Sequence, residues 1–162
     1  MLERAFDLLE QWVIVPLLAF CLAFITIGVF IVVVMRYGFS TSFLWGEELS
    51  IFAFIWSVFL GAVIGVRRHI HLEFDFVGER LSGRWRGGQR LVIDLSILGV
   101  GLLLLLEGWT FSELSVRRFS PALGISLFLP TLVIPISGGL MVLVVLGDLM
   151  RDLRQILTGR SA

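Results

Sequence analysis

Residues 12–35 read WVIVPLLAFCLAFITIGVFIVVVM, a run that holds no charged side chain. The hydrocarbon core of a bilayer needs about 20 consecutive apolar residues of helix to cross it. A helix on the surface of a soluble domain keeps one polar face, and this run has none. The stretch therefore predicts a helix that spans a membrane.

Three further apolar runs follow, at residues 49–66, 91–111 and about 123–147. The chain is 57% hydrophobic and 16% charged, whereas an ordinary soluble domain is about 45–50% apolar and about 25% charged. A very apolar soluble bundle is the alternative, and the lengths of the runs argue against it. We predict an all-α integral membrane protein, a single domain over residues 1–162 with four transmembrane helices.

The segment before the first run carries three acids and one arginine. It lacks the basic start of a signal peptide, so we expect the first span to be retained. Leu2, Phe6 and Leu9 recur at helical spacing, which predicts a short interfacial amphipathic helix at residues 2–10.

The arginines indicate the orientation of the chain. With four spans, ten arginines lie on the side of the two termini and the middle loop, and three lie on the other side. Loops rich in Arg and Lys stay in the cytoplasm. We therefore expect both termini to be cytoplasmic, and residues 36–48 and 112–122 to face outward.

The stretch RRHIHLEFDFV, residues 67–77, leaves the second run. It can be read as extended or as helical, and in both cases its apolar side chains can rest on the membrane surface. His69, His71, Glu73 and Asp75 are also candidate metal ligands, but no second ligand cluster elsewhere in the sequence would complete the shell. We expect no bound metal.

Other cofactors and partners are restricted by what the sequence contains. Cys21 is the single cysteine, which excludes a dithiol redox pair. Both histidines lie outside the apolar runs, so paired haem ligation between helices is excluded. The formal net charge is zero, which argues against nucleic acid as a partner. We expect no cofactor, and the lipid bilayer is the surrounding medium.

The apolar runs hold few ionisable side chains. Asp94 and Glu107 lie near the ends of the third run, and the other three runs have no acidic or basic residue. Transport and catalytic sites in membranes normally place such groups at mid-depth. The sequence thus argues against an enzyme and against a transport site within this chain alone.

Two features of the runs concern helix packing. Small residues recur every fourth position along the second run, a ridge that lets helices approach closely, with a partner inside or outside this chain; they are Ala53, Ser57, Gly61 and Gly65. In the fourth run, Pro130 and Pro135 precede Gly138-Gly139. They predict a kinked or locally unwound helix, either for packing on a neighbour or for holding a ligand.

The outer entry to the second run reads FLWGEELS, residues 43–50. Trp45 suits the headgroup layer, and Glu47 and Glu48 suit the positive end of the helix dipole. Arg36 ends the first run at the same depth. We predict an ion pair between Arg36 and either Glu47 or Glu48, with Glu48 as the candidate partner.

The string WGEELSIFAFIWSVFLGAVIGVRRHIHLEFD, residues 45–75, resembles the signature of the small membrane subunit (DctQ-like) of tripartite ATP-independent periplasmic (TRAP) transporters. The matching positions are Trp45, Glu47, Glu48, residues 59–62, Arg67 or Arg68, His71 and Asp75. His69, Ile70 and Glu73 depart from the family pattern in the cytoplasmic loop.

The resemblance implies an accessory small permease subunit in the bacterial inner membrane. Its implied partners are a large multi-span membrane subunit and a periplasmic substrate-binding protein, in a sodium-coupled importer of carboxylates. Glu113, Arg117 and Arg118, on the outward side, are candidates for contact with the binding protein. The rival functions are a self-sufficient small dimeric transporter and a membrane redox subunit; the latter would need the intramembrane histidines or paired cysteines that are missing here.

Overall fold

The computed structural model describes residues 8–68 and 84–158, and the regular elements of this part are helices. They are η1 (Glu10–Ile14), α2 (Val15–Gly38), α3 (Leu44–Arg67), α5 (Arg84–Ser115), α6 (Phe128–Thr131) and α7 (Val133–Thr158). Four segments are long and apolar enough to cross a membrane: Glu10–Gly38, Leu44–Arg67, Val92–Ser115 and Phe128–Met150. The predicted all-α chain with four membrane-spanning helices is confirmed. Most of the predicted interfacial segment at residues 2–10, and nearly all of residues 67–77, lie outside the described part.

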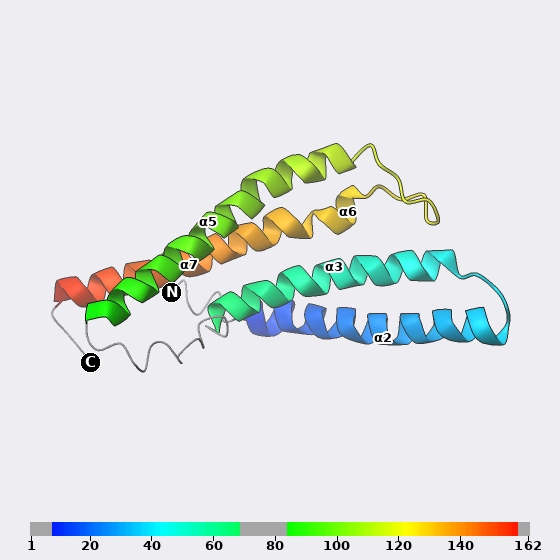
Figure 1. Cartoon of the computed structure of the whole chain (residues 1–162), viewed down its shortest axis with the longest axis horizontal. Coiled ribbons are helices and arrows are strands. Elements are labelled where there is room, and N and C mark those ends of the chain that lie inside the picture. The colour runs from blue at the N-terminus through cyan, green and yellow to red at the C-terminus, as the bar shows by residue number, and fades with distance from the viewer. Residues whose placement is uncertain (1–7, 69–83, 159–162) are drawn as a thin grey trace.

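The spans form two antiparallel helix pairs (Figure 1). Helix α2 packs along α3, α5 packs along α7, and contacts between α3 and α7 join the two pairs. Because the chain reverses between successive spans, the start of α2 and the end of α3 share one end of the bundle. Residues 39–43 and 116–127 share the opposite end, which we call the loop end.

The buried apolar cluster lies where the two pairs meet. Leu60 and Val63 of α3 belong to one cluster with Val133 and Met141 of α7, and Ile14 of η1 joins it. The outer faces of the helices carry large exposed apolar side chains, such as Phe20 and Phe30 of α2. An apolar surface of this extent is unfavourable in water, so lipid or another membrane protein must cover it.

The first span begins with one turn of π-helix. The Val15 N–H donates to the Glu10 carbonyl, five residues back. Pro16 follows immediately and has no N–H to donate, so the regular hydrogen-bond ladder is interrupted at this point. The wider turn, common where a helix carries a functional group, sets the rotation of Glu10 relative to the rest of the span.

The fourth span is divided at Leu132, between α6 and α7. Pro135 cannot donate to the Thr131 carbonyl, which would otherwise lack a partner inside the membrane. The Ser112 hydroxyl of α5 lies 3.1 Å from that carbonyl and 2.8 Å from the Gly108 carbonyl. The Thr131 carbonyl at the interruption therefore has a hydrogen-bond donor on the neighbouring helix. Residues 123–127, which the sequence placed in this span, belong to the preceding loop.

Glycines allow α5 and α7 to approach closely. A Cβ built on Gly138 would lie 2.6 Å from the Leu105 nitrogen and 2.8 Å from the Gly101 oxygen, both backbone atoms of α5. A Cβ on Gly108 would lie 2.7 Å from a side-chain carbon of Ile134. These contacts join the second helix pair by backbone proximity, as small residues do in membranes.

Candidate functional site

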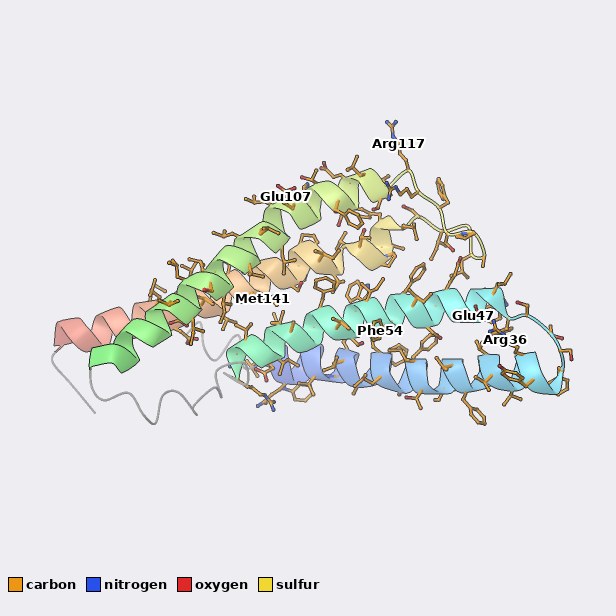
Figure 2. All side chains as sticks on the ribbon, in the orientation of Figure 1. Arg36, Glu47, Phe54, Glu107, Arg117 and Met141 are labelled. Carbon is orange, nitrogen blue, oxygen red and sulfur yellow. The ribbon has the colours of Figure 1, made fainter. Side chains whose placement is uncertain are left out.

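Three polar contact groups lie at the ends of the spans, and the first joins α2 to α3 at the loop end. The Arg36 guanidinium forms an ion pair with the Glu47 carboxylate (Figure 2). Of the two carboxylates considered as partners, the structure pairs Arg36 with Glu47 and not with the candidate Glu48. Consecutive helical positions point about 100° apart, so Glu47 is turned toward α2 while Glu48 is turned toward the loop at residues 116–127.

The second group is a clamp formed by Glu48 on that loop. The Ser120 hydroxyl and the backbone N–H groups of Ala122 (3.0 Å) and Leu123 (3.2 Å) all donate to its carboxylate. A carboxylate that accepts several hydrogen bonds forms stronger contacts than a neutral acceptor would. The clamp ties the loop, more than seventy positions along the chain, to the start of α3.

The loop is also held by its own hydrogen bonds. The Ser120 N–H donates to the Ile125 carbonyl at 2.9 Å, and residues 119 and 126 form an isolated antiparallel bridge. Gly124 closes the turn with a φ of +66°, a conformation that a side chain would strain. The loop therefore presents its exposed residues in a defined arrangement.

The exposed residues of the loop include both arginines that were predicted to contact the binding protein. Arg117 and Arg118 lie just beyond the end of α5, with exposed side chains, and Arg117 projects away from the bundle (Figure 2). Glu113 is exposed in the last turn of α5 and accepts a hydrogen bond from the Trp109 indole N–H at 2.8 Å. The structure thus places all three residues at the loop end.

We expect the Glu48 clamp to control the order of this loop. In Glu48→Ala, the Ala122 N–H loses its acceptor, so its hydrogen exchange should accelerate by roughly tenfold to a hundredfold, given about 1.5–3 kcal/mol for a hydrogen bond to a charged group. Hydrogen-exchange mass spectrometry of residues 116–127 measures this. Glu47→Ala, which breaks only the pair with Arg36, is the matched control. Equal exchange in both variants would contradict the clamp.

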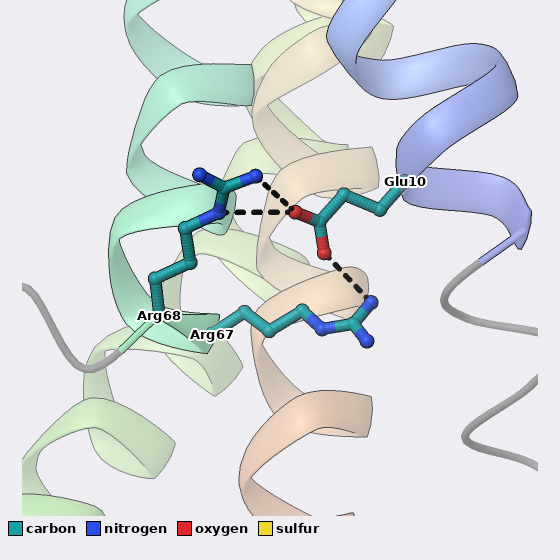
Figure 3. Close-up of polar contacts among 3 residues, drawn as sticks. All are labelled: Glu10, Arg67 and Arg68. Carbon is teal, nitrogen blue, oxygen red and sulfur yellow. Dashed lines mark hydrogen bonds and ion pairs between the residues drawn. The ribbon is translucent and has the colours of Figure 1, made fainter.

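The third group lies at the opposite end of the bundle and was not predicted from the sequence. Glu10, with a side chain that is 9% exposed, lies between two arginines at the end of α3 (Figure 3). Its Oε2 is 2.8 Å from Arg67 Nη1, and its Oε1 is 3.2 Å from Arg68 Nη2 and 3.3 Å from Arg68 Nε. This cluster connects η1 to α3 where the chain leaves the second span.

The predicted ridge on α3 is only partly buried. Ser57 and Gly65 are buried within this chain, whereas Ala53 and Gly61 are half-exposed. A Cβ built on Gly61 would meet nothing within 4 Å. Among the described glycines, the closest approach of two helix backbones is at Gly138, between α5 and α7, and the open side of Gly61 is available to a partner.

The remaining predicted residues divide into two sets. Trp45 is half exposed and its ring packs against Phe43, with centroids 4.1 Å apart. His71 and Asp75, and the candidate metal ligands His69 and Glu73, lie outside the described residues. Among residues 8–68 and 84–158, no group of three His, Cys, Asp or Glu side chains is arranged to hold a metal ion.

Together, the three groups fix α3 at both of its ends. Arg36–Glu47 and the Glu48 clamp hold its start against α2 and the loop, and the Glu10 cluster holds its end against η1. The charged side chains of α2 and α3 thus lie in terminal turns, where they connect elements. This arrangement is typical of a rigid structural unit.

Comparison with known proteins identifies similar chains. The family described as tripartite ATP-independent periplasmic transporters, DctQ component, matches residues 25–155. The chain is 36% identical over 95 residues to the C4-dicarboxylate TRAP transporter small permease protein DctQ of Vibrio cholerae serotype O1, covering 59% of this chain and 41% of that protein. It is 28% identical over 137 residues to the isethionate TRAP transporter permease protein DctMQ of Oleidesulfovibrio alaskensis, covering 83% of this chain and 21% of that protein.

A third relative matches over most of both chains. The sialic acid TRAP transporter small permease protein SiaQ of Vibrio cholerae serotype O1 is 27% identical over 145 residues, which cover 88% of this chain and 80% of that protein. The chain spans less than half the length of the first two relatives and most of the length of this one.

Proposed function

Because this chain belongs to the family of the DctQ component of TRAP transporters, we propose that it is the accessory small permease subunit of a sodium-coupled, binding-protein-dependent importer of carboxylates. Membership makes it a membrane component of a transporter and not an enzyme. In this proposal the chain braces a large membrane subunit that carries the substrate, and it offers docking surface to a periplasmic binding protein.

We propose that the chain crosses the bacterial inner membrane with both termini in the cytoplasm. The excess of arginine on the side of the termini and middle loop supports this orientation. The loop end, with residues 39–43 and 116–127, then faces the periplasm. The Glu10 cluster lies at the cytoplasmic surface.

A large membrane partner is supported by the surface of the four spans. Exposed apolar side chains occur along α2, α3 and α5, far more than the α3–α7 core buries. The match covers only 21% of the DctMQ permease protein, so that relative is much longer than this chain. Its length is consistent with a small subunit joined to a larger membrane part. The rigid α3 would hold such a partner in a fixed position.

Docking of the binding protein is supported by the ordered loop. The Glu48 clamp fixes residues 120–123, and Arg117 and Arg118 project from the same loop as two adjacent exposed cations. Such a pair attracts an acidic surface and accelerates encounter at low ionic strength. We propose that the arginines contact acidic side chains of the binding protein.

The substrate class is proposed from the relatives. They are named for C4-dicarboxylate, isethionate and sialic acid, and each of these carries an acidic group. The mid-membrane parts of α2 and α3 offer no charged residue to bind an anion or sodium. We therefore assign substrate and sodium binding to the large subunit, and choose a carboxylate as the substrate class.

Reconstitution tests the proposal. Liposomes that contain this chain, its large subunit and the binding protein should take up substrate only with an inward sodium gradient, and uptake should be lost when this chain is omitted. The Arg117→Glu/Arg118→Glu double variant should reduce uptake at limiting binding protein by about tenfold, an effect that salt diminishes. Arg36→Gln is the matched control, since this arginine is engaged with Glu47.

Two results would overturn the proposal. Full uptake by the large subunit and binding protein without this chain would remove its accessory role. Substrate flux through liposomes that hold only this chain would instead indicate the self-sufficient dimeric transporter.

A further inference from the structure

Helix α5 has three faces, and only one of them is covered within the described part of the chain. The face toward α7 holds Gly101, Gly108, Ser112 and Ser115, which are buried. The other two faces are exposed along the length of the span. They differ in chemistry, and this difference indicates what covers each of them.

The first exposed face carries a carboxylate within the span. Its residues recur at spacings of three and four and are all exposed; they are Ser96, Val100, Leu103, Glu107, Thr110 and Leu114. We call it the Glu107 face. Figure 2 shows Glu107 on α5, away from the core between the helix pairs.

The second exposed face is apolar until its last turn. Leu95, Leu102 and Leu106 are exposed, followed by Trp109 and Glu113. The Trp109 indole N–H donates to the Glu113 carboxylate at the end of this face. We call it the Leu106 face. Its chemistry is that of a helix face in contact with lipid.

The depth of Glu107 makes contact with lipid unfavourable. Glu107 lies eight positions before Ser115, the nearer end of the span, which is about 12 Å along the helix axis. The Cα–Cβ bonds of a helix tilt toward its N-terminus, which for α5 is the opposite end. The side chain therefore starts in the direction away from the nearer end of the span, which lengthens the path from the carboxylate to water.

The polar neighbours of Glu107 do not satisfy it. The Thr110 hydroxyl donates to the Leu106 carbonyl at 3.2 Å, and the Ser96 hydroxyl donates to the Val92 carbonyl at 2.7 Å. Within residues 8–68 and 84–158, Glu107 takes part in no ion pair or hydrogen bond of its side chain. Ionisable side chains in a membrane interior normally pair with another group.

We propose that the Glu107 face packs against a helix of the large membrane subunit, and that Glu107 accepts a hydrogen bond from an arginine, lysine or other donor side chain there. This inference rests on the proposed function, because it takes the large subunit as the partner. The charge of Glu107 requires a complementary donor, which acyl chains lack. The Leu106 face, about 100° around the helix, contacts lipid.

Site-specific photo-crosslinking in the intact complex tests this assignment. Benzoylphenylalanine placed at Leu103 should give an adduct with the large subunit, whereas the same residue at Leu106 should give none. The two sites are matched, since these leucines are 60% and 65% exposed and lie within one turn of the same helix. Adducts with the large subunit from both sites, or from Leu106 alone, would overturn the proposal.

A second measurement tests the carboxylate itself. In Glu107→Leu, the amount of large subunit that co-purifies in detergent should fall by roughly threefold to tenfold. Glu107→Gln, which keeps an acceptor oxygen, should lose less. Leu106→Ala is the control and should retain the wild-type amount. Unchanged co-purification in Glu107→Leu would contradict the role of Glu107.

The outcomes separate this inference from the proposed function. A stable wild-type complex without an adduct at Leu103 overturns the assignment of the face and leaves the accessory role intact. An adduct between two copies of this chain overturns it in favour of self-association. Absence of any complex with the large subunit would refute the proposed function, and this inference with it.

Discussion

Replacement of Gly138 by alanine is expected to destabilise the protein by about 1–3 kcal/mol, the usual effect of forcing an extra methyl into a packed contact. The added Cβ would lie 2.6 Å from the Leu105 nitrogen, 2.8 Å from the Gly101 oxygen and 2.9 Å from the Leu104 carbonyl carbon. These are backbone atoms of α5, so no side chain can rotate away. The two helices must separate, and the Ser112 contact with the Thr131 carbonyl would be weakened with them. Unfolding in mixed micelles of increasing denaturing detergent measures the change.

Gly139 provides a control that differs by one position. A Cβ there would lie 3.6 Å from the Leu105 Cδ1, an ordinary van der Waals distance. Alanine is also a better helix former than glycine by about 1 kcal/mol. Gly139→Ala should therefore be neutral or slightly stabilising. Equal destabilisation by both variants would show that the close approach of α5 and α7 at Gly138 does not govern the stability of this region.

Glu10→Gln is the second substitution with a large expected effect. It removes the charge that lies 2.8 Å from Arg67 and 3.2 Å from Arg68, at a site where the Glu10 and Arg67 side chains are only 9% and 21% exposed. Loss of one partner from a buried pair costs several kcal/mol. Arg68 is 59% exposed and water can solvate it, so we expect a smaller loss, roughly 2–3 kcal/mol.

A double-mutant cycle isolates the contribution of the pair. Glu10→Gln and Arg67→Gln should each destabilise the protein, and the double variant should be destabilised by less than the sum of the two. Gln11→Ala, at the adjacent exposed position, should have little effect. Strictly additive losses in the cycle would contradict a direct interaction between Glu10 and Arg67.

The contacts at the loop end show where reasoning from the sequence reached its limit. The sequence placed Arg36, Glu47 and Glu48 at one depth, because all three lie at the edges of apolar runs. It could not determine which carboxylate faces α2, because that depends on the rotation of α3 about its axis. The structure turns Glu47 toward Arg36 and Glu48 toward Ser120.

The packing surfaces show the same limit. The regular ridge from Ala53 to Gly65 was evident from its spacing. A Cβ built on Gly61, however, would meet no atom within 4 Å, so no neighbouring helix packs on it closely. The close contact instead involves Gly138, which the sequence indicated only as part of a helix interruption. Spacing identifies a surface that permits close approach, but not the helix that occupies it.

The Glu10 cluster left no clear pattern in the sequence. Arg67 and Arg68 were readily explained by the charge asymmetry of the loops, and Glu10 appeared as one of several acids before the first run. Fifty-eight positions separate Glu10 from Arg68. The signal that could have found the cluster is an acid next to the first run, at the same membrane edge as an arginine pair, once the antiparallel order of two spans is assumed.

The sequence by itself determined that this chain is helical and crosses a membrane four times, because hydrocarbon requires every backbone polar group to be satisfied within its own segment. That requirement applies to each apolar run separately, so it needs no knowledge of neighbours. The tertiary structure decided which helices touch, which carboxylate holds the loop and which face of α5 remains exposed. Those features depend on helix rotation, tilt and side-chain fit between distant segments, and a linear pattern of hydropathy does not contain them.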